Sequence, residues 1–195
     1  MVFRKEKLVG KNVELIPLEA NHLEALYEAS KAPEIWAHMP KKVETLEDAK
    51  AFIDEALEIK ATGSQFPFII FHRETGKAIG STRFLEIDRE NKGIEIGFTW
   101  LNPSVWRTSV NTECKYLLLQ YCFEELKYIR VQFKTDILNV RSQTAIARLG
   151  AKKEGILRNQ KIRQDGTYRD SVYFSIIESE WEEVKSRLEA KQNRS

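Results

Sequence analysis

The segment from Ile94 to Ile137 constrains the fold most strongly, because it reads as strand, loop, helix and strand in succession. IEIGFTWL at 94–101 has the short apolar pattern of a strand, and residues 111–127 carry apolar side chains at helical spacing. IRVQFKTDI at 129–137 predicts a second strand. Strands joined through a helix pair in parallel, so this segment predicts a βαβ crossover.

The rest of the chain predicts the other elements of one mixed domain. We expect strands at 12–17, 66–72, 78–88, 151–158 and 169–177, and helices at 19–31, 46–60 and 140–149, with a last helix from Ser179. No linker rich in proline, glycine or serine divides residues 1–195. The fold class is therefore α+β, with a mixed, mostly antiparallel central sheet and flanking helices in a single domain.

Several helix ends carry capping patterns. Thr45 with Asp48, and Ser179 with Glu182, have the spacing of a capping box. Asn139 stands where an N-cap belongs, and Gly150 follows the same helix as a C-cap.

Strand 94–101 is expected to alternate its faces. The period of two places Ile94, Ile96, Phe98 and Trp100 on one face and leaves Glu95, Gly97, Thr99 and Leu101 on the other. A carboxylate therefore shares a face with small residues.

Composition excludes several classes of protein. The 31 basic and 29 acidic residues nearly balance, which makes nucleic-acid binding unlikely even with the basic segment 158–169. No apolar run approaches a membrane span and the N-terminal stretch lacks a signal-peptide core, so the cytoplasm is the expected location. Cys114, Cys122 and the three histidines lack ligand spacing, and we expect no metal site.

The loop before helix 111–127 is a candidate anion site, since a helix N-terminus presents unpaired N–H groups and a positive dipole end. Thr108 and Ser109 bring hydroxyl donors, and Arg107 brings a charge. The alternative is that Thr108, Ser109 and Asn111 only cap the helix.

Longer stretches resemble a known family. IEIGFTWLNPSVWRTSVNTECKYLLLQYCFEEL and FKTDILNVRSQTAIARLGAKKEGILR resemble the GNAT acetyltransferases, most closely the ribosomal-protein N-terminal alanine acetyltransferases. The similarity covers nearly the whole chain. Its strongest pieces are Glu95 to Leu101, Asn102-Pro103 with Trp106, Thr112-Glu113, and Asn139 with Ser142.

This resemblance implies acetyl-CoA as co-substrate, bound between strands 94–101 and 129–137 where they splay apart. The pyrophosphate is expected on the loop from Trp106 to Asn111. The family's two small positions there, usually glycine or alanine, hold Ser109 and Asn111. Serine and asparagine still permit close approach and left-handed backbone at modest cost. The cofactor-binding residues implied are Phe98, Trp100, Leu101, Trp106, Arg107, Thr108, Ser109, Val110, Asn111, Asn139 and Ser142.

The resemblance also implies catalytic roles. Main-chain N–H groups near Phe98 to Leu101 would hold the thioester oxygen. Glu95 is our candidate base, acting through water, and Ser142 could relay a proton to the leaving thiolate. Glu95 could equally be a salt-bridged structural carboxylate. Asn139 and Ser142 could be no more than a helix cap and a first-turn polar residue.

The acceptor is expected to be a primary amine, either a protein N-terminus or a small amine, attacking directly in a ternary complex. Segments 33–45 and 159–170 would wall its groove, with Trp36, Tyr168, Asp165 and Asp170 as candidate lining residues. Lys161 stands where the ribosomal-protein branch often has a glutamate, which weakens that assignment. The alternative is a catalytically weak module that binds CoA or a regulatory ligand, and we expect a monomer or homodimer.

Overall fold

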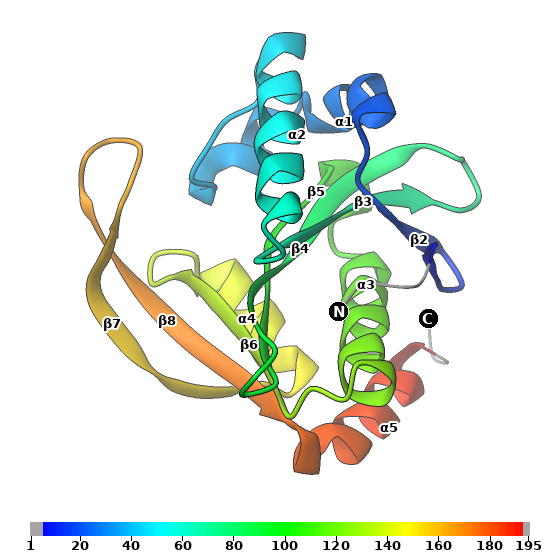
Figure 1. The fold of residues 1–195 in the computed structure, drawn as a ribbon, viewed down its shortest axis with the longest axis vertical. Coiled ribbons are helices and arrows are strands. Elements are labelled where there is room, and N and C mark those ends of the chain that lie inside the picture. Colours follow the sequence, from blue (N-terminus) through cyan, green and yellow to red (C-terminus); the bar gives the residue numbers. More distant parts are fainter. Residues whose placement is uncertain (1–5, 193–195) are drawn as a thin grey trace.

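The computed structural model describes residues 6–192, and its strands form one sheet (Figure 1). Within this range eight strands lie in the order β1-β2-β3-β4-β5-β6-β8-β7. They are β1 Leu8–Val9, β2 Val13–Pro17, β3 Phe66–His72, β4 Ala78–Asp88, β5 Gly93–Leu101, β6 Arg130–Asp136, β7 Lys152–Ile162 and β8 Tyr168–Ile177. The α-helices are α1 Leu23–Ser30, α2 Leu46–Ala61, α3 Val110–Gln120, α4 Val140–Leu149 and α5 Trp181–Gln192. The predicted α+β class is confirmed.

Helices cover both faces of the sheet and create two apolar cores. On one face α1 and α2 pack around Leu26, Phe52 and Trp100 (Figure 1). On the other face α3, α4 and α5 pack on side chains that include Ile94, Ile96 and Phe133. Because the sheet separates these two cores, each strand can present chemistry to two different compartments.

The predicted caps of α2 and α4 are confirmed, whereas the helix expected at 19–31 begins as α1 only at Leu23, after a 3₁₀ turn over Ala20–His22. Thr45 and Asp48 form the capping box of α2, with Asp48 N–H donating to Thr45 Oγ1 at 3.1 Å and Thr45 N–H donating to Asp48 Oδ2 at 2.9 Å. Gly150 ends α4 in the left-handed region at φ 106°.

The Ser179–Glu182 capping box is wrong. A 3₁₀ turn over Glu178–Glu180 precedes α5, and the Glu180 carboxylate accepts the N–H of Ile177 at 3.1 Å. The chain therefore turns two residues earlier than the sequence pattern indicates, and α5 begins at Trp181.

The crossover helix changes its hydrogen bonding near its end. After α3 the chain makes a π-helical turn over Tyr121–Glu125, in which Leu126 N–H donates to Tyr121 O at 2.9 Å. The predicted helix at 111–127 is thus confirmed in place, with a wider last turn.

The crossover joins two parallel strands that soon separate. β5 pairs with β6 only over Gly93–Glu95 and Arg130–Gln132. Beyond this point β5 stays bonded to β4 as far as Leu101, and β6 stays bonded to β8 as far as Asp136. The expected splay is confirmed, and it begins directly after Glu95.

A β-bulge in β5 overturns the expected alternation. Phe98 has φ 48°, and the register moves so that Phe98 and Thr99 lie opposite the single residue Thr82. Each side chain after the bulge is therefore turned to the other face. Trp100 packs among α1 and α2, opposite Ile94 and Ile96, and the prediction that they share a face is wrong.

Candidate functional site

A pocket lies at the N-terminal end of α3. Its volume is about 520 Å³, and its lining residues are Arg107, Thr108, Ser109, Thr112, Lys191 and Gln192. Four of these come from the predicted loop and the first turn of α3. Lys191 and Gln192 come from the end of α5 and carry no motif that sequence reasoning could have used. Two cations at a helix N-terminus suit an anionic group.

The first turn of α3 leaves backbone donors for such an anion. The first main-chain hydrogen bond of the helix is Glu113 N–H to Ser109 O at 2.9 Å. Thr108 Oγ1 accepts from Val110 N–H at 3.3 Å, while the Ser109 side chain makes no cap hydrogen bond. The reading of this loop as a set of capping side chains therefore fits Thr108 but not Ser109.

The left-handed residue of the loop is not at either predicted small position. Arg107 has φ 64°, whereas Ser109 has φ −70° and Asn111 lies inside α3. The turn is made before the small positions, so neither requires glycine for its backbone conformation. This explains how the loop keeps its path without glycines.

Two other loop residues serve the fold. Trp106 Nε1 donates to Leu101 O at 2.8 Å, and the Arg141 guanidinium carbon lies 4.0 Å from the centre of its ring. This contact brings the start of α4 against the loop before α3. Val110 is buried in the core below α3.

Two β5 residues of the predicted site, Trp100 and Leu101, place their side chains in the two cores. The Trp100 ring lies 5.3 Å from that of Trp36, and Leu101 is buried in the opposite core. Trp36 is itself buried and donates its Nε1–H to Ser30 O at 3.0 Å. Of the predicted groove residues, Trp36 therefore packs in the core, while Tyr168 is exposed.

Glu95 is buried at the point where β5 and β6 part. Its Oε2 accepts from Gln132 Nε2 at 3.0 Å and lies 3.3 Å from Lys134 Nζ. A Cβ atom on Gly97 would come within 3.1 Å of Glu95 Oε1, so the carboxylate lies over the glycine. Since Ile94 and Ile96 face α3, Glu95 faces the side of α1 and α2.

Asn139 and Ser142 lie on the far side of the gap, at the start of α4. Asn139 Oδ1 accepts from Ser142 N–H at 3.0 Å, which confirms the helix cap. The cap uses the oxygen of the amide and leaves its Nδ2–H₂ group as a donor. Both side chains are half-buried.

Comparison with known proteins agrees with this geometry. Residues 12–152 match the model of the family described as "Acetyltransferase (GNAT) domain". The chain is a GNAT acetyltransferase. Acetyl-CoA is the co-substrate of this family.

Relatives of this acetyltransferase cover nearly all of its length. The uncharacterized N-acetyltransferase YnaD of Bacillus subtilis is 27% identical over 89% of the chain and 98% of its own length. The crystal structure of a GCN5-related N-acetyltransferase from Brucella melitensis has a TM-score of 0.89 at 28% identity, covering 96% of this chain and 85% of that one. The ribosomal-protein-S5-alanine acetyltransferase of Vibrio fischeri shares the fold, with a TM-score of 0.75 at 16% identity over 91% and 99% of the two chains.

One buried cation of the acetyltransferase carries no sequence motif and was missed. Lys115 of α3 is 6% exposed, and its Nζ donates to Thr99 Oγ1 at 2.5 Å. Burial lowers the pKa of this ammonium to about 8. Helical spacing alone places residue 115 among apolar neighbours, and only the structure shows that it reaches β5.

The two cysteines of the acetyltransferase lie in the core. Both are fully enclosed, and burial raises the pKa of Cys114 to about 12 and that of Cys122 well above its ordinary value. Neither is a thiolate at neutral pH. Within residues 6–192 no group of three or more His, Cys, Asp or Glu side chains is placed to hold a metal ion.

Cations surround Glu95 on the side of α1 and α2. The positive charges of Lys134 and Arg169 lower the pKa of Lys161, after the larger effect of lost hydration. Arg83 is buried between the rings of Phe52 and Phe98, whose centres lie 4.6 and 4.9 Å from its guanidinium carbon.

The predicted acidic residues of the β7–β8 hairpin are used locally. Asp165 Oδ1 accepts from Thr167, and Asp170 Oδ1 accepts from Asn159 N–H at 2.8 Å. Glu95, by contrast, is buried at the last pair of β5 and β6, directly before the strands part.

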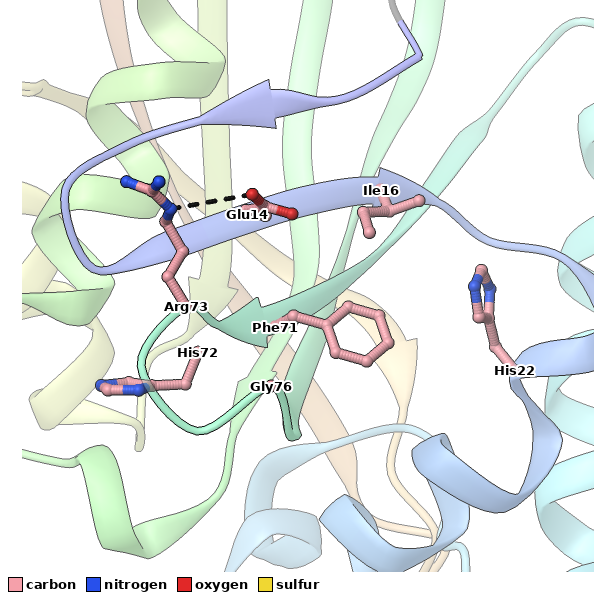
Figure 2. A pocket seen from close by; sticks show the side chains of 7 residues that line it. All are labelled: Glu14, Ile16, His22, Phe71, His72, Arg73 and Gly76. Atoms are coloured by element: carbon pink, nitrogen blue, oxygen red, sulfur yellow. Dashed lines mark ion pairs between the residues drawn. The ribbon is translucent and has the colours of Figure 1, made fainter.

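A second pocket, of about 380 Å³, lies beside β2 and the end of β3 and contains none of the predicted site residues (Figure 2). Figure 2 shows Arg73 turned toward Glu14, with 3.7 Å between Nε and Oε1. Arg73 Nη1 also donates to Gly10 O at 2.7 Å. These contacts tie the β1–β2 turn to the β3–β4 turn, which is a structural role.

Proposed function

We propose that this acetyltransferase moves the acetyl group of acetyl-CoA to a primary amine, a small amine or a protein N-terminus. The observation that carries the proposal is the separation of β5 from β6 directly after Glu95. It leaves extended backbone on both sides of a gap that the pantetheine arm can fill like an added strand. The pocket at the start of α3 supplies N–H groups and two cations for the pyrophosphate.

The chemistry needs a group that receives the amine proton and donors for the thioester oxygen. N–H groups of β5 between Phe98 and Leu101 would hold the oxygen, since the bulge at Phe98 and Thr99 interrupts the regular pairing with β4 before it resumes at Trp100. Glu95 would receive the proton through a water molecule. Its burial beside Lys134 keeps the carboxylate fixed on the side of α1 and α2.

Direct attack in a ternary complex is supported by the state of the cysteines. An acyl-enzyme mechanism through cysteine needs an accessible thiolate. Cys114 and Cys122 are buried, and both have raised pKa values. The amine nitrogen would therefore attack the thioester carbon without a covalent intermediate on sulfur.

The test is release of free thiol from acetyl-CoA in the presence of amines. We expect turnover with a member of a library of small primary amines and peptides with free N-termini, and none with the same peptides acetylated beforehand. Initial-rate lines that intersect in double-reciprocal plots would support a ternary complex. Tight CoA binding without turnover across the library would instead support a binding module.

The gap and its pocket do not select between small amines and protein N-termini. The cations around Glu95 favour an acceptor with a nearby anionic group over a polycation, because like charges repel. The library should therefore include amino acids and acidic peptides beside polyamines.

A further inference from the structure

Lys115 connects the two strands that separate. Its ammonium donates to Thr99 Oγ1 of β5 at 2.5 Å and lies 6.0 Å from the centre of the Phe133 ring of β6. These strands no longer pair at this level. The side chain thus reaches from α3 across the gap on the face opposite Glu95.

The ammonium has few partners for a buried charge. It has three N–H bonds, and Thr99 Oγ1 is the only hydrogen-bond acceptor that residues 6–192 give it. No carboxylate in the described chain forms an ion pair with it; its neighbour Glu113 turns away to accept from Asn12 N–H at 2.9 Å. The other titratable neighbour is the protonated thiol of Cys114.

A buried, unpaired charge is unfavourable, and an apolar residue would fit this core better. Lysines of this kind with lowered pKa values are frequent at catalytic sites. A value of about 8 lies close to the ordinary thiol value of about 8.5, so a proton can pass between the two groups with little free-energy difference.

We propose that Lys115 is the proton donor to the sulfur of the departing CoA, with Thr99 orienting its ammonium. The inference rests on the proposed function, which places the thioester in the gap beside Thr99. The amine nitrogen forms the new C–N bond, the C–S bond breaks, and its electron pair goes to sulfur. Sulfur takes a proton from Lys115 Nζ, and the nitrogen loses one through Glu95. Solvent then restores both groups, so the sum is amine plus thioester giving amide plus thiol.

The two proton transfers take place on opposite faces of the sheet. Glu95 faces α1 and α2, while Lys115 lies below the same gap on the side of α3. The acid and the base therefore do not contact each other, and each can reach the reacting thioester from its own side.

A titration of bound CoA tests this role of Lys115 without any acceptor. The thiolate absorbance of CoA bound to the protein is titrated against pH in the wild type, in K115M and in K115R, with desulfo-CoA complexes as blanks. K115M removes the charge but keeps an apolar side chain of similar length, and K115R keeps the charge. K153M, an exposed lysine on β7, is the matched control.

We expect the pKa of the bound thiol to be higher in K115M than in the wild type by about 1 or more, because the ammonium stabilises the thiolate. K153M should match the wild type, and K115R should keep a lowered thiol pKa. Equal thiol pKa values in wild type and K115M, with CoA bound to both, would overturn the inference and leave the proposed function intact. Failure of the wild type to bind CoA would overturn both.

Discussion

The Glu95 carboxylate is held in place by two side chains of β6. Gln132 and Lys134 both contact Oε2, so the carboxylate is fixed on one oxygen. If Glu95 is only structural, removing Lys134 should harm the protein as much as changing Glu95 itself. If Glu95 is a base, only the change at Glu95 should abolish proton transfer, so a Lys134 variant is the control.

We expect E95Q to lower kcat by about 10²-fold or more while the KM for acetyl-CoA stays close to the wild-type value. The amide keeps the shape of the side chain but cannot take the amine proton. K134M removes the ion pair and leaves the carboxylate, so it should retain most of the turnover. Steady-state kinetics and thermal melts distinguish a base from a structural carboxylate. If E95Q and K134M lower the melting temperature equally and E95Q shows no additional loss of kcat, Glu95 only forms a structural ion pair.

Asn139 has two candidate roles, capping α4 and binding the pantetheine arm, and each role uses a different atom of its side-chain amide. Oδ1 caps α4 through Ser142 N–H, and Nδ2 is left to donate to the pantetheine arm. N139D should keep the cap and the helix stability but weaken CoA binding, because it replaces the donor by a carboxylate oxygen. N139A should weaken binding and also lower the free energy of unfolding by about 1 kcal/mol. Calorimetry with CoA and denaturant melts measure the two effects; unchanged CoA affinity in N139D would limit Asn139 to capping.

The loop and the first turn of α3 together line the pocket that we propose for the pyrophosphate. Ser109 occupies the N-cap position without using its side chain as a cap, and the pocket opens beside it. A new negative charge there has opposite effects in the two interpretations. It would stabilise a bare helix end, but it would repel a bound pyrophosphate.

S109D should therefore weaken CoA binding about tenfold or more, a change of about 1.4 kcal/mol in binding free energy. The same variant should melt at or slightly above the wild-type temperature, because aspartate is a good cap. S104D, an exposed serine at the other end of this loop, is the control and should leave affinity unchanged. Equal CoA affinity in S109D and wild type would remove the pyrophosphate from this loop.

Most helices and strands of this protein could be predicted from the sequence, whereas contacts between distant strands could not. Periodicity, caps and turn residues predicted nearly every helix and strand, because those signals are local. The bulge at Phe98 has no local signal, since it depends on pairing with Thr82 in another strand. For this reason Trp100 was placed on the wrong face. Lys115 was missed for a related reason: its partner Thr99 lies across the fold, and the sequence gives no distance between them.

The β7–β8 hairpin extends from the sheet on the β6 side of the gap (Figure 1). An ion pair between half-buried Arg163 and buried Asp136 links its far end to β6. Arg163 Nε lies 2.7 Å from Asp136 Oδ2 and Nη2 lies 2.9 Å from Oδ1, a bidentate contact. Arg163 also donates to Tyr168 O, on the second strand of the hairpin. This charged pair thus ties the expected wall of the acceptor groove to the sheet, and Gln164 Nε2 at the hairpin turn also donates to Met39 O at 2.7 Å.

This pair makes the stability of the hairpin depend on pH. The Arg163 guanidinium holds the pKa of Asp136 below its ordinary value of 3.8. Because folding favours the ionised carboxylate, its contribution to the free energy of unfolding is complete above that ordinary value and is lost as the pH falls through the lower folded value.

At neutral pH we expect D136N to lower the free energy of unfolding by about 1–3 kcal/mol, since the Arg163 guanidinium loses its charged acceptor. Denaturant melts of both proteins at several pH values measure the difference, which should shrink as the pH falls below the folded pKa of Asp136. D165N, whose carboxylate is exposed at the hairpin turn, is the control and should show a much smaller loss at neutral pH. A D136N deficit that stays constant down to acid pH would show that the ionised carboxylate is not what holds the hairpin.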